Sequence, residues 1–327
     1  MDEEQRLAIQ KRAHSELQRI AEVRQYFQVT ESSDGRIGRA LREVTPVIEE
    51  FARNPGATVP SVKSYNYGRL QLFQLWRIAE CATKLVSRSP ALADRVREIA
   101  RGSYYPERKP QHRGLQAQSE LLTGALLEWA GYEPQWQSEG ADWIVQVQGR
   151  RTPIEVKRIS SRDAIKSAMR EANAQDMASG GDGIVWVDAT DVMTPNYYSW
   201  KVHEALNPST ALLPVLKQRG STLIENSRTR AKSGTVSCIV VFSSFPIEYI
   251  DNPDIIQAMI DSGRLPLPTH KSREDYLTDM DLKGLLPILG TSHAEAIYAR
   301  NMGRSINHEG FGELVKAITA GVDERKL

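Results

Sequence analysis

Two acidic residues and one lysine lie in a short segment whose pattern is that of two adjacent strands. Asp142 precedes an alternating apolar run, and Glu155 and Lys157 follow thirteen and fifteen positions later. Side chains alternate between the two faces of a strand, so Glu155 and Lys157 must point to one side, and a hairpin would bring Asp142 beside them. Two converging carboxylates suit Mg2+, which binds carboxylate, water and phosphate oxygens. The lysine could then orient or deprotonate an attacking water.

The segments around these residues have the periodicity needed to position them. An apolar stripe at helical spacing ends at Gly131, a residue suited to a helix C-terminal cap. Beyond it, alternating and β-branched runs predict strands, and Gly149 marks a turn between the first two. The predicted elements, in order, are a helix at 116–130, strands at 142–148 and 153–159, a helix at 162–177 and a buried strand at 184–187.

Four short motifs fall within this region. They are Ser119-Glu120-Leu121-Leu122, Gly131-Tyr132, Ala141-Asp142-Trp143-Ile144-Val145 and Ile154-Glu155-Val156-Lys157. Together with the order of elements they resemble the successive motifs of the PD-(D/E)XK nucleases, the restriction-endonuclease-like superfamily. The resemblance covers roughly residues 112–190, and Ala141 stands where the motif usually has its proline. It implies an α/β fold with a restriction-endonuclease-like mixed sheet core flanked by helices.

The same resemblance implies roles for individual residues. Asp142 and Glu155 would bind the metal together with the main-chain carbonyl of Val156, and the metal would be Mg2+, with Mn2+ as a substitute. Glu120 would ligate a second metal or hold a metal-bound water. Gln175 resembles a glutamine that supports the active site in some relatives, although a solvated helix glutamine is an equally good interpretation.

Basic residues are concentrated on the predicted hairpin and on the helix that follows it. They would supply a local phosphate-binding surface, although the net charge of the chain is only +1. A solvated charged face is the alternative interpretation for each of them. The residues are Arg150, Arg151, Arg158, Arg162, Lys166 and Arg170.

The flanking regions predict further domains. Residues 1–105 have helical periodicity and form an N-terminal helical domain, which a proline-containing linker separates from the nuclease-like core at 106–250. Within the core, 197–227 reads as mostly helical and 236–245 as another central strand, with the sheet ending near Ile250. Residues 251–327 read as a C-terminal helical extension.

Composition excludes several other classes of protein. The apolar runs are shorter than the ~20 residues of a membrane span, so we expect a soluble cytoplasmic protein with no membrane partner. Cys81 and Cys238 are too few for a disulfide framework or a cysteine zinc site. The six histidines show no zinc-binding or triad spacing.

The sequence therefore predicts a Mg2+-dependent endonuclease that hydrolyses phosphodiester bonds of nucleic acid, with DNA as the expected polymer. Restriction or phage defence is the biological setting that the resemblance implies, and paired double-strand cuts would need a homodimer. The alternative is a non-catalytic nucleic-acid-binding or assembly protein with the same fold. Glu128, near the end of the helix that carries Glu120, is expected to be solvated.

Overall fold

A computed structural model describes most of the first two hundred residues and three later strands. All structural statements below concern these residues. The described residues are 3–57, 62–101, 104, 113–179, 183–193, 200–203, 238–250 and 288–298. Most of the predicted linker, at 105–112, lies outside them.

The predicted helical character of the first hundred residues is confirmed. In the first helix pair, α1 packs against α2, and α3 then carries a buried ion pair from Arg69 to Glu16 of α1. The pair is fully removed from solvent at the arginine side chain, so its hydrogen bonds replace those of water. The four helices are α1 Glu3–Phe27, α2 Arg36–Arg53, α3 Val62–Arg88 and α4 Leu92–Glu98.

The described residues form two compact units, whose boundary lies inside α3. One unit includes α1, α2 and α3 as far as Trp76, and the other includes α3 from Arg77, α4 and residues 113–179 and 183–193.

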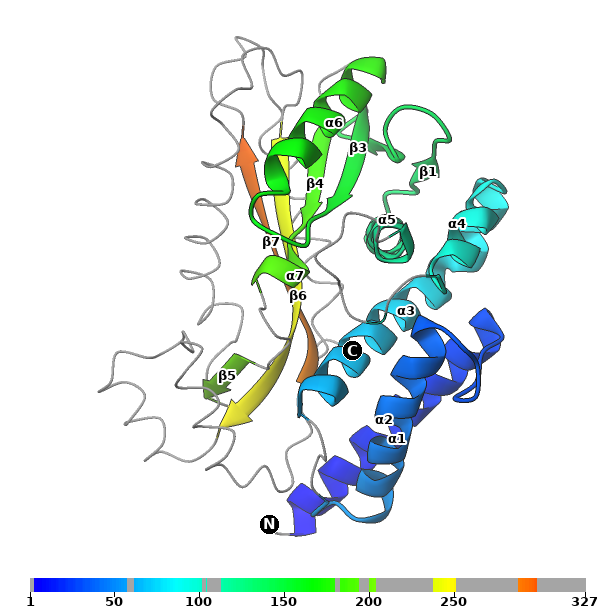
Figure 1. Cartoon of the computed structure of the whole chain (residues 1–327), viewed down its shortest axis with the longest axis vertical. Coiled ribbons are helices and arrows are strands. Elements are labelled where there is room, and N and C mark those ends of the chain that lie inside the picture. The colour runs from blue at the N-terminus through cyan, green and yellow to red at the C-terminus, as the bar shows by residue number, and fades with distance from the viewer. Residues whose placement is uncertain are drawn as a thin grey trace, which may run out of the picture. The chain divides into compact units, whose positions relative to one another are not determined.

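The order of elements in the core is the one predicted. Helix, strand, strand, helix and strand follow one another, and Figure 1 shows α6 lying along β3 and β4. These elements are α5 Arg113–Trp129, β2 Trp143–Val147, β3 Arg150–Arg158, α6 Ile165–Ala178 and β4 Ile184–Asp188. Two short elements complete the region, β1 Gln135–Trp136 and α7 Thr190–Met193.

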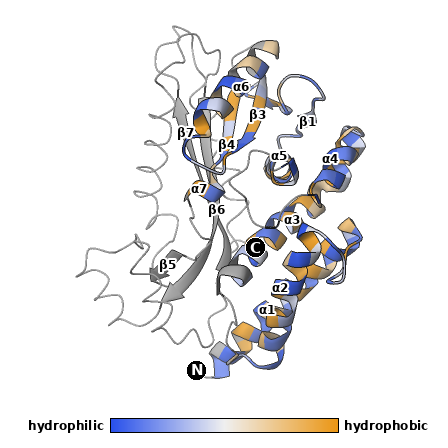
Figure 2. Cartoon of the chain, viewed as in Figure 1, coloured by the Kyte–Doolittle hydropathy of each residue, from blue (hydrophilic) through white to orange (hydrophobic). Residues whose placement is uncertain are grey.

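The core sheet is mixed, and β3 is an interior strand. It pairs antiparallel with β2 and parallel with β4, whose other neighbour is the parallel strand β6 (Cys238–Ile250). Figure 2 shows hydrophobic residues along β3 and β4, as expected for strands covered on both faces. The hairpin turn between β2 and β3 is made by Gln148 and Gly149, both with positive φ, which matches the twist of the strands.

The later strands correct one prediction and add a strand that was not predicted. The four described residues of the segment predicted as mostly helical form β5 (Trp200–His203), which pairs in parallel with the second half of β6, and the rest of that segment lies outside the described residues. The sheet does not end near Ile250, because β7 (Ile288–Tyr298) also pairs with β6 and lies inside the predicted helical extension. Apolar periodicity did not separate these strands from helices.

Two glycines shape α5: one ends the helix, and the other lets it approach the sheet. Gly131, with φ of 84°, ends the helix as predicted, and its N–H and that of Tyr132 donate to Glu128 and Leu127 carbonyls. A β-carbon at Gly124 would collide with the Trp143 indole, so glycine there lets helix and sheet approach closely.

Within the described residues, no helix is long and apolar enough to cross a membrane.

Candidate functional site

The site lies where β2 and β3 separate. The last ladder pair is Trp143 with Ile154, and Asp142 is the residue just before the start of β2. Its carboxylate accepts a hydrogen bond of 2.8 Å from the Val156 N–H across the gap. Asp142 is 9% exposed. The predicted approach of this aspartate to the motif strand is therefore present.

Glu155 and Lys157 point to the face of β3 that α6 covers. The Lys157 Nζ lies 2.8 Å from Glu155 Oε1 and 3.8 Å from Glu171 Oε2 of α6. The opposite face, which carries Trp143 and Arg158, contacts α5 through Glu120 and Ser119. The predicted common side of Glu155 and Lys157 is confirmed by these contacts.

One oxygen of Glu155 has no polar partner in the described part of the chain. Its Oε1 is paired with Lys157, while its Oε2 is buried and has no hydrogen-bond partner among the described residues. A buried carboxylate oxygen without a partner has lost its water without compensation, which is costly unless an ion or a water completes the site.

Glu120 reaches the same place from α5, and its two oxygens are engaged by other side chains. Arg95 of α4 approaches it with Nε at 2.9 Å from Oε2 and Nη2 at 3.2 Å from Oε1. Gln116, one turn earlier on α5, donates to Oε1 at 2.9 Å. Glu120 is 2% exposed, so these side chains take the place of water around it.

The three carboxyls share an environment that disfavours their charged forms. Burial, together with the neighbouring Asp142 charge, raises the pKa of Glu120 to about 8 and that of Glu155 to about 8. Burial raises the pKa of Asp142 to about 6, and the hydrogen bond from Val156 N–H acts in the opposite direction. Burial and mutual repulsion favour the protonated forms of these carboxyls. A divalent cation beside them would favour the ionised forms instead.

Lys157 responds in the opposite way. Burial acts to lower the pKa of Lys157, but the carboxylates of Glu155, Asp142 and Glu171 together outweigh it and raise the pKa above its ordinary value. The ammonium group is therefore charged at neutral pH. A charged ammonium group can stabilise negative charge beside it, and it cannot accept a proton.

Gln116 also belongs to the site, although it was not among the residues predicted from the sequence. Its Oε1 accepts from Arg158 N–H at 2.9 Å and its Nε2 donates to the Val156 carbonyl at 2.8 Å. The side-chain amide thus takes the place of a strand peptide along the edge of β3 that β2 has left. Its spacing of one helical turn from Glu120 is the only signal in the sequence.

Gln175 lies on the face of α6 that borders the site. On this face Glu171 approaches Lys157, and the Ser179 hydroxyl, just after the helix, accepts a hydrogen bond from Ala141 N–H. Gln175 lies between these two residues at helical spacing, and its Oε1 is buried without a hydrogen-bond partner in the described part of the chain. This placement is compatible with the supporting role that the resemblance implies.

The residues fit a divalent ion with few protein ligands. No group of three or more His, Cys, Asp or Glu within the described residues is placed to hold a metal. Two carboxylates, from Asp142 and Glu155, and the Val156 carbonyl remain, and Mg2+ commonly takes only one or two carboxylates plus waters. The Val156 carbonyl already accepts one hydrogen bond from Gln116, which leaves it one lone pair.

Five of the six predicted phosphate-binding residues are exposed at the surface. Arg151 also donates to the Ser179 carbonyl at 3.4 Å, so the hairpin is tied to the end of α6. The exposed residues are Arg150, Arg151, Arg162, Lys166 and Arg170.

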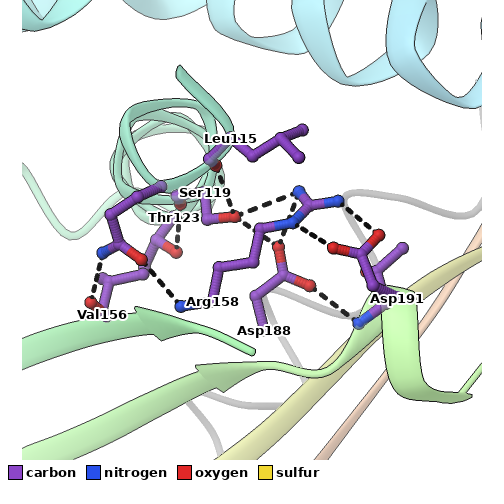
Figure 3. Close-up of polar contacts among 9 residues, drawn as sticks. Leu115, Ser119, Thr123, Val156, Arg158, Asp188 and Asp191 are labelled. Carbon is purple, nitrogen blue, oxygen red and sulfur yellow. Dashed lines mark hydrogen bonds and ion pairs between the residues drawn. The ribbon is translucent and has the colours of Figure 1, made fainter. Parts of the chain in front are cut away.

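Arg158 does not belong to that surface. Its side chain is 4% exposed, and it forms a bidentate pair with Asp191 of α7 at 2.8 and 2.9 Å. It also lies 3.4 Å from Asp188 and 3.3 Å from the Ser119 hydroxyl (Figure 3). Because side chains alternate along β3, Arg158 points to the face opposite Lys157. That face is covered by α5, so Arg158 cannot contact a phosphate backbone there.

Asp188 and Glu128 have structural contacts. Asp188, 1% exposed, accepts from Ser119 at 2.5 Å and from Thr190 N–H at 3.0 Å, joining α5, β4 and α7 (Figure 3). Glu128 was expected to be solvated, and this was wrong. Its side chain is 9% exposed and pairs with Arg88 of α3 at 2.7 Å, a partner forty residues away.

In comparisons with known proteins, no family model, curated protein or solved structure matches the chain.

Proposed function

We propose that this chain is a metal-dependent endonuclease of the PD-(D/E)XK type that hydrolyses phosphodiester bonds of DNA. The observation that carries the proposal is that Asp142, Glu155 and Lys157 lie together in a buried position where β2 and β3 separate, and that one Glu155 oxygen has no partner in the described part of the chain. Three charged groups in a sheet interior are costly, and a structural ion pair would need only two of them.

Asp142 and Glu155 would hold Mg2+ together with the Val156 carbonyl. When bound, the ion supplies Lewis acidity and a lowered pKa for a coordinated water. Lys157 keeps its ammonium group beside Glu155 and would stabilise the charge that develops on the phosphate. Gln116 fixes the Val156 carbonyl, and so fixes the position of this ligand relative to β3.

The exposed basic residues of the hairpin and of α6 would bind the phosphate backbone. Arg162, Lys166 and Arg170 lie along exposed positions of α6 or the turn before it, on the helix whose Glu171 approaches Lys157. Such contacts position a nucleic acid without reading its sequence. A restriction or phage-defence setting, and a homodimer for double-strand cuts, are proposed from the resemblance alone.

A cleavage assay tests the function. Plasmid, single-stranded DNA and RNA are incubated with the full chain in Mg2+, in Mn2+ and in excess EDTA. We expect cleavage of DNA with either metal and none with EDTA, because the available ligands are oxygens. Asp142→Asn and Glu155→Gln should each abolish cleavage, whereas Asp94→Asn, at an 80% exposed position, should not change it. Binding of DNA without cleavage in either metal would instead support a non-catalytic binding protein.

A further inference from the structure

Arg95, outside every motif of the sequence analysis, is held against Glu120 by all of its guanidinium nitrogens. Nε and Nη2 contact the two oxygens of Glu120, and Nη1 is paired with Glu98 on the same helix. The guanidinium also lies 5.9 Å from the ring centre of Trp136. The planar guanidinium group of Arg95 is therefore fixed in place, and its donor geometry matches that of a carboxylate.

Glu120 consequently differs from the other two carboxylates of the site. Arg95 contacts both oxygens of Glu120, by a hydrogen bond at Oε1 and by an ion pair at Oε2, and Gln116 donates a second hydrogen bond to Oε1. Glu155 Oε2 has neither an ion pair nor a hydrogen bond among the described residues, and Asp142 uses one oxygen for Val156 N–H. A divalent ion at Glu120 would have to approach a guanidinium that contacts both oxygens, whereas the Lys157 ammonium lies against only one oxygen of Glu155.

On the basis of the proposed function, we propose that Arg95 is a positioning residue that serves as the permanent counter-cation of Glu120. The site then binds a single divalent ion, at Asp142 and Glu155, and Glu120 binds none. Glu120 instead acts through Gln116, which it and the Val156 carbonyl both engage. Contacts thus link Arg95 of α4, through Glu120 and Gln116 of α5, to the Val156 carbonyl of β3, which would bind the ion.

The experiment counts bound Mn2+ on the intact chain by electron paramagnetic resonance and by calorimetry. We expect one Mn2+ per chain in the wild type. Arg95→Met releases the Glu120 carboxylate, so the count should rise to two and return to one in Arg95→Met/Glu120→Gln. Arg95→Lys keeps the positive charge and should stay at one. Arg97→Met, two residues further on α4 and 73% exposed at its side chain, is the matched control and should also stay at one.

Two ions in the wild type, or a count of one in folded Arg95→Met, would overturn the proposal. If Arg95→Met does not fold, the wild type and Glu120→Gln decide: one ion in each supports the proposal, and a fall from two to one overturns it. If the wild type binds two ions and cleaves DNA, the single-ion inference is wrong and the proposed nuclease function stands. A wild type that binds one ion and cleaves no nucleic acid would instead remove the proposed nuclease function and keep the ion count.

Discussion

Lys157 lies between two carboxylates in different surroundings. Glu155 is buried at 2.8 Å from its ammonium group, whereas Glu171 of α6 is 66% exposed at 3.8 Å. The lysine side chain itself is 15% exposed, so its charge can still face a bound phosphate. The position suits a group that acts on the reacting phosphate and contributes little to the wider contact with a polymer.

Substituting Lys157 should separate chemistry from binding. Lys157→Met removes the charge and keeps much of the packing of the stem, so we expect cleavage to fall by roughly 100-fold or more, in the range of electrostatic transition-state stabilisation. DNA affinity, shared over many phosphate contacts, should change less than about twofold. Single-turnover cleavage and filter binding measure the two effects.

Lys84→Met, at an exposed position of α3, provides the control for that substitution. It removes one charge from the surface and should leave both measurements unchanged. If Lys157→Met weakened binding and cleavage by the same factor, the lysine would belong to the binding surface and not to the reaction.

At the scale of elements, α6 has two different faces. Ile165 and Ala172 are buried against the sheet, while Arg162, Lys166 and Arg170 are exposed on the helix and the turn before it. The helix therefore carries its basic residues outward while Glu171 and Gln175 border the site.

Removal of the basic residues of α6 should weaken binding in a salt-dependent way. Arg162→Ala/Lys166→Ala/Arg170→Ala is expected to lower affinity equally for all sequences and to reduce the salt slope by about 1 for each phosphate that the protein no longer neutralises. Affinity is measured over a series of salt concentrations. A control with Lys84→Ala/Arg97→Ala, two exposed basic residues on α3 and α4, should keep the slope. An unchanged slope in the triple variant would show that this face does not touch phosphate.

The helices and strands of the core could be predicted from local sequence patterns, whereas the contact partners of several side chains could not. Period-two alternation correctly placed Glu155 and Lys157 on one face, and Gly131 correctly marked the end of α5. The same alternation separates Arg158 from Lys157, but its partner Asp191 lies thirty-three residues away and no local signal joins them. Gln116 was missed because it binds main-chain groups, which every residue has.

At the scale of the whole molecule, the flanks were predicted less well than the core. The described strand β7 lies where a helical extension was expected, and β5 lies where a helix was expected. Strands of a central sheet and buried helices both appear as apolar runs, so period alone does not distinguish them.

The carboxyl cluster should make the stability of the whole protein depend on pH and metal. The pKa values of Glu120 and Glu155 are raised from 4.5 to about 8, so the stability they contribute is fully present below pH 4.5 and is lost as pH rises through 8. Lys157 and Arg95 face these groups and oppose the shifts without cancelling them. In EDTA we therefore expect Tm to fall between pH 6 and pH 8, by roughly 2–4 °C per kcal/mol.

Mg2+ should offset that loss, so its stabilising effect is expected to be larger at pH 8 than at pH 6. Differential scanning calorimetry in EDTA and in Mg2+ measures both effects. Glu120→Gln/Glu155→Gln removes the two groups whose pKa is raised to about 8 and should flatten the pH dependence between pH 6 and pH 8. An identical slope in this variant would place the titration elsewhere in the protein.

The amide of Gln116 has a consequence for the protein in solution. An open strand edge can pair with the edge of another chain, and such pairing is a route to aggregation. Beyond the end of β2, β3 would present the Val156 carbonyl and the Arg158 N–H as such an edge, and Gln116 occupies both. One side chain thus protects the strand from self-association at a place that must stay uncovered by a neighbouring strand if the carboxylates are to meet.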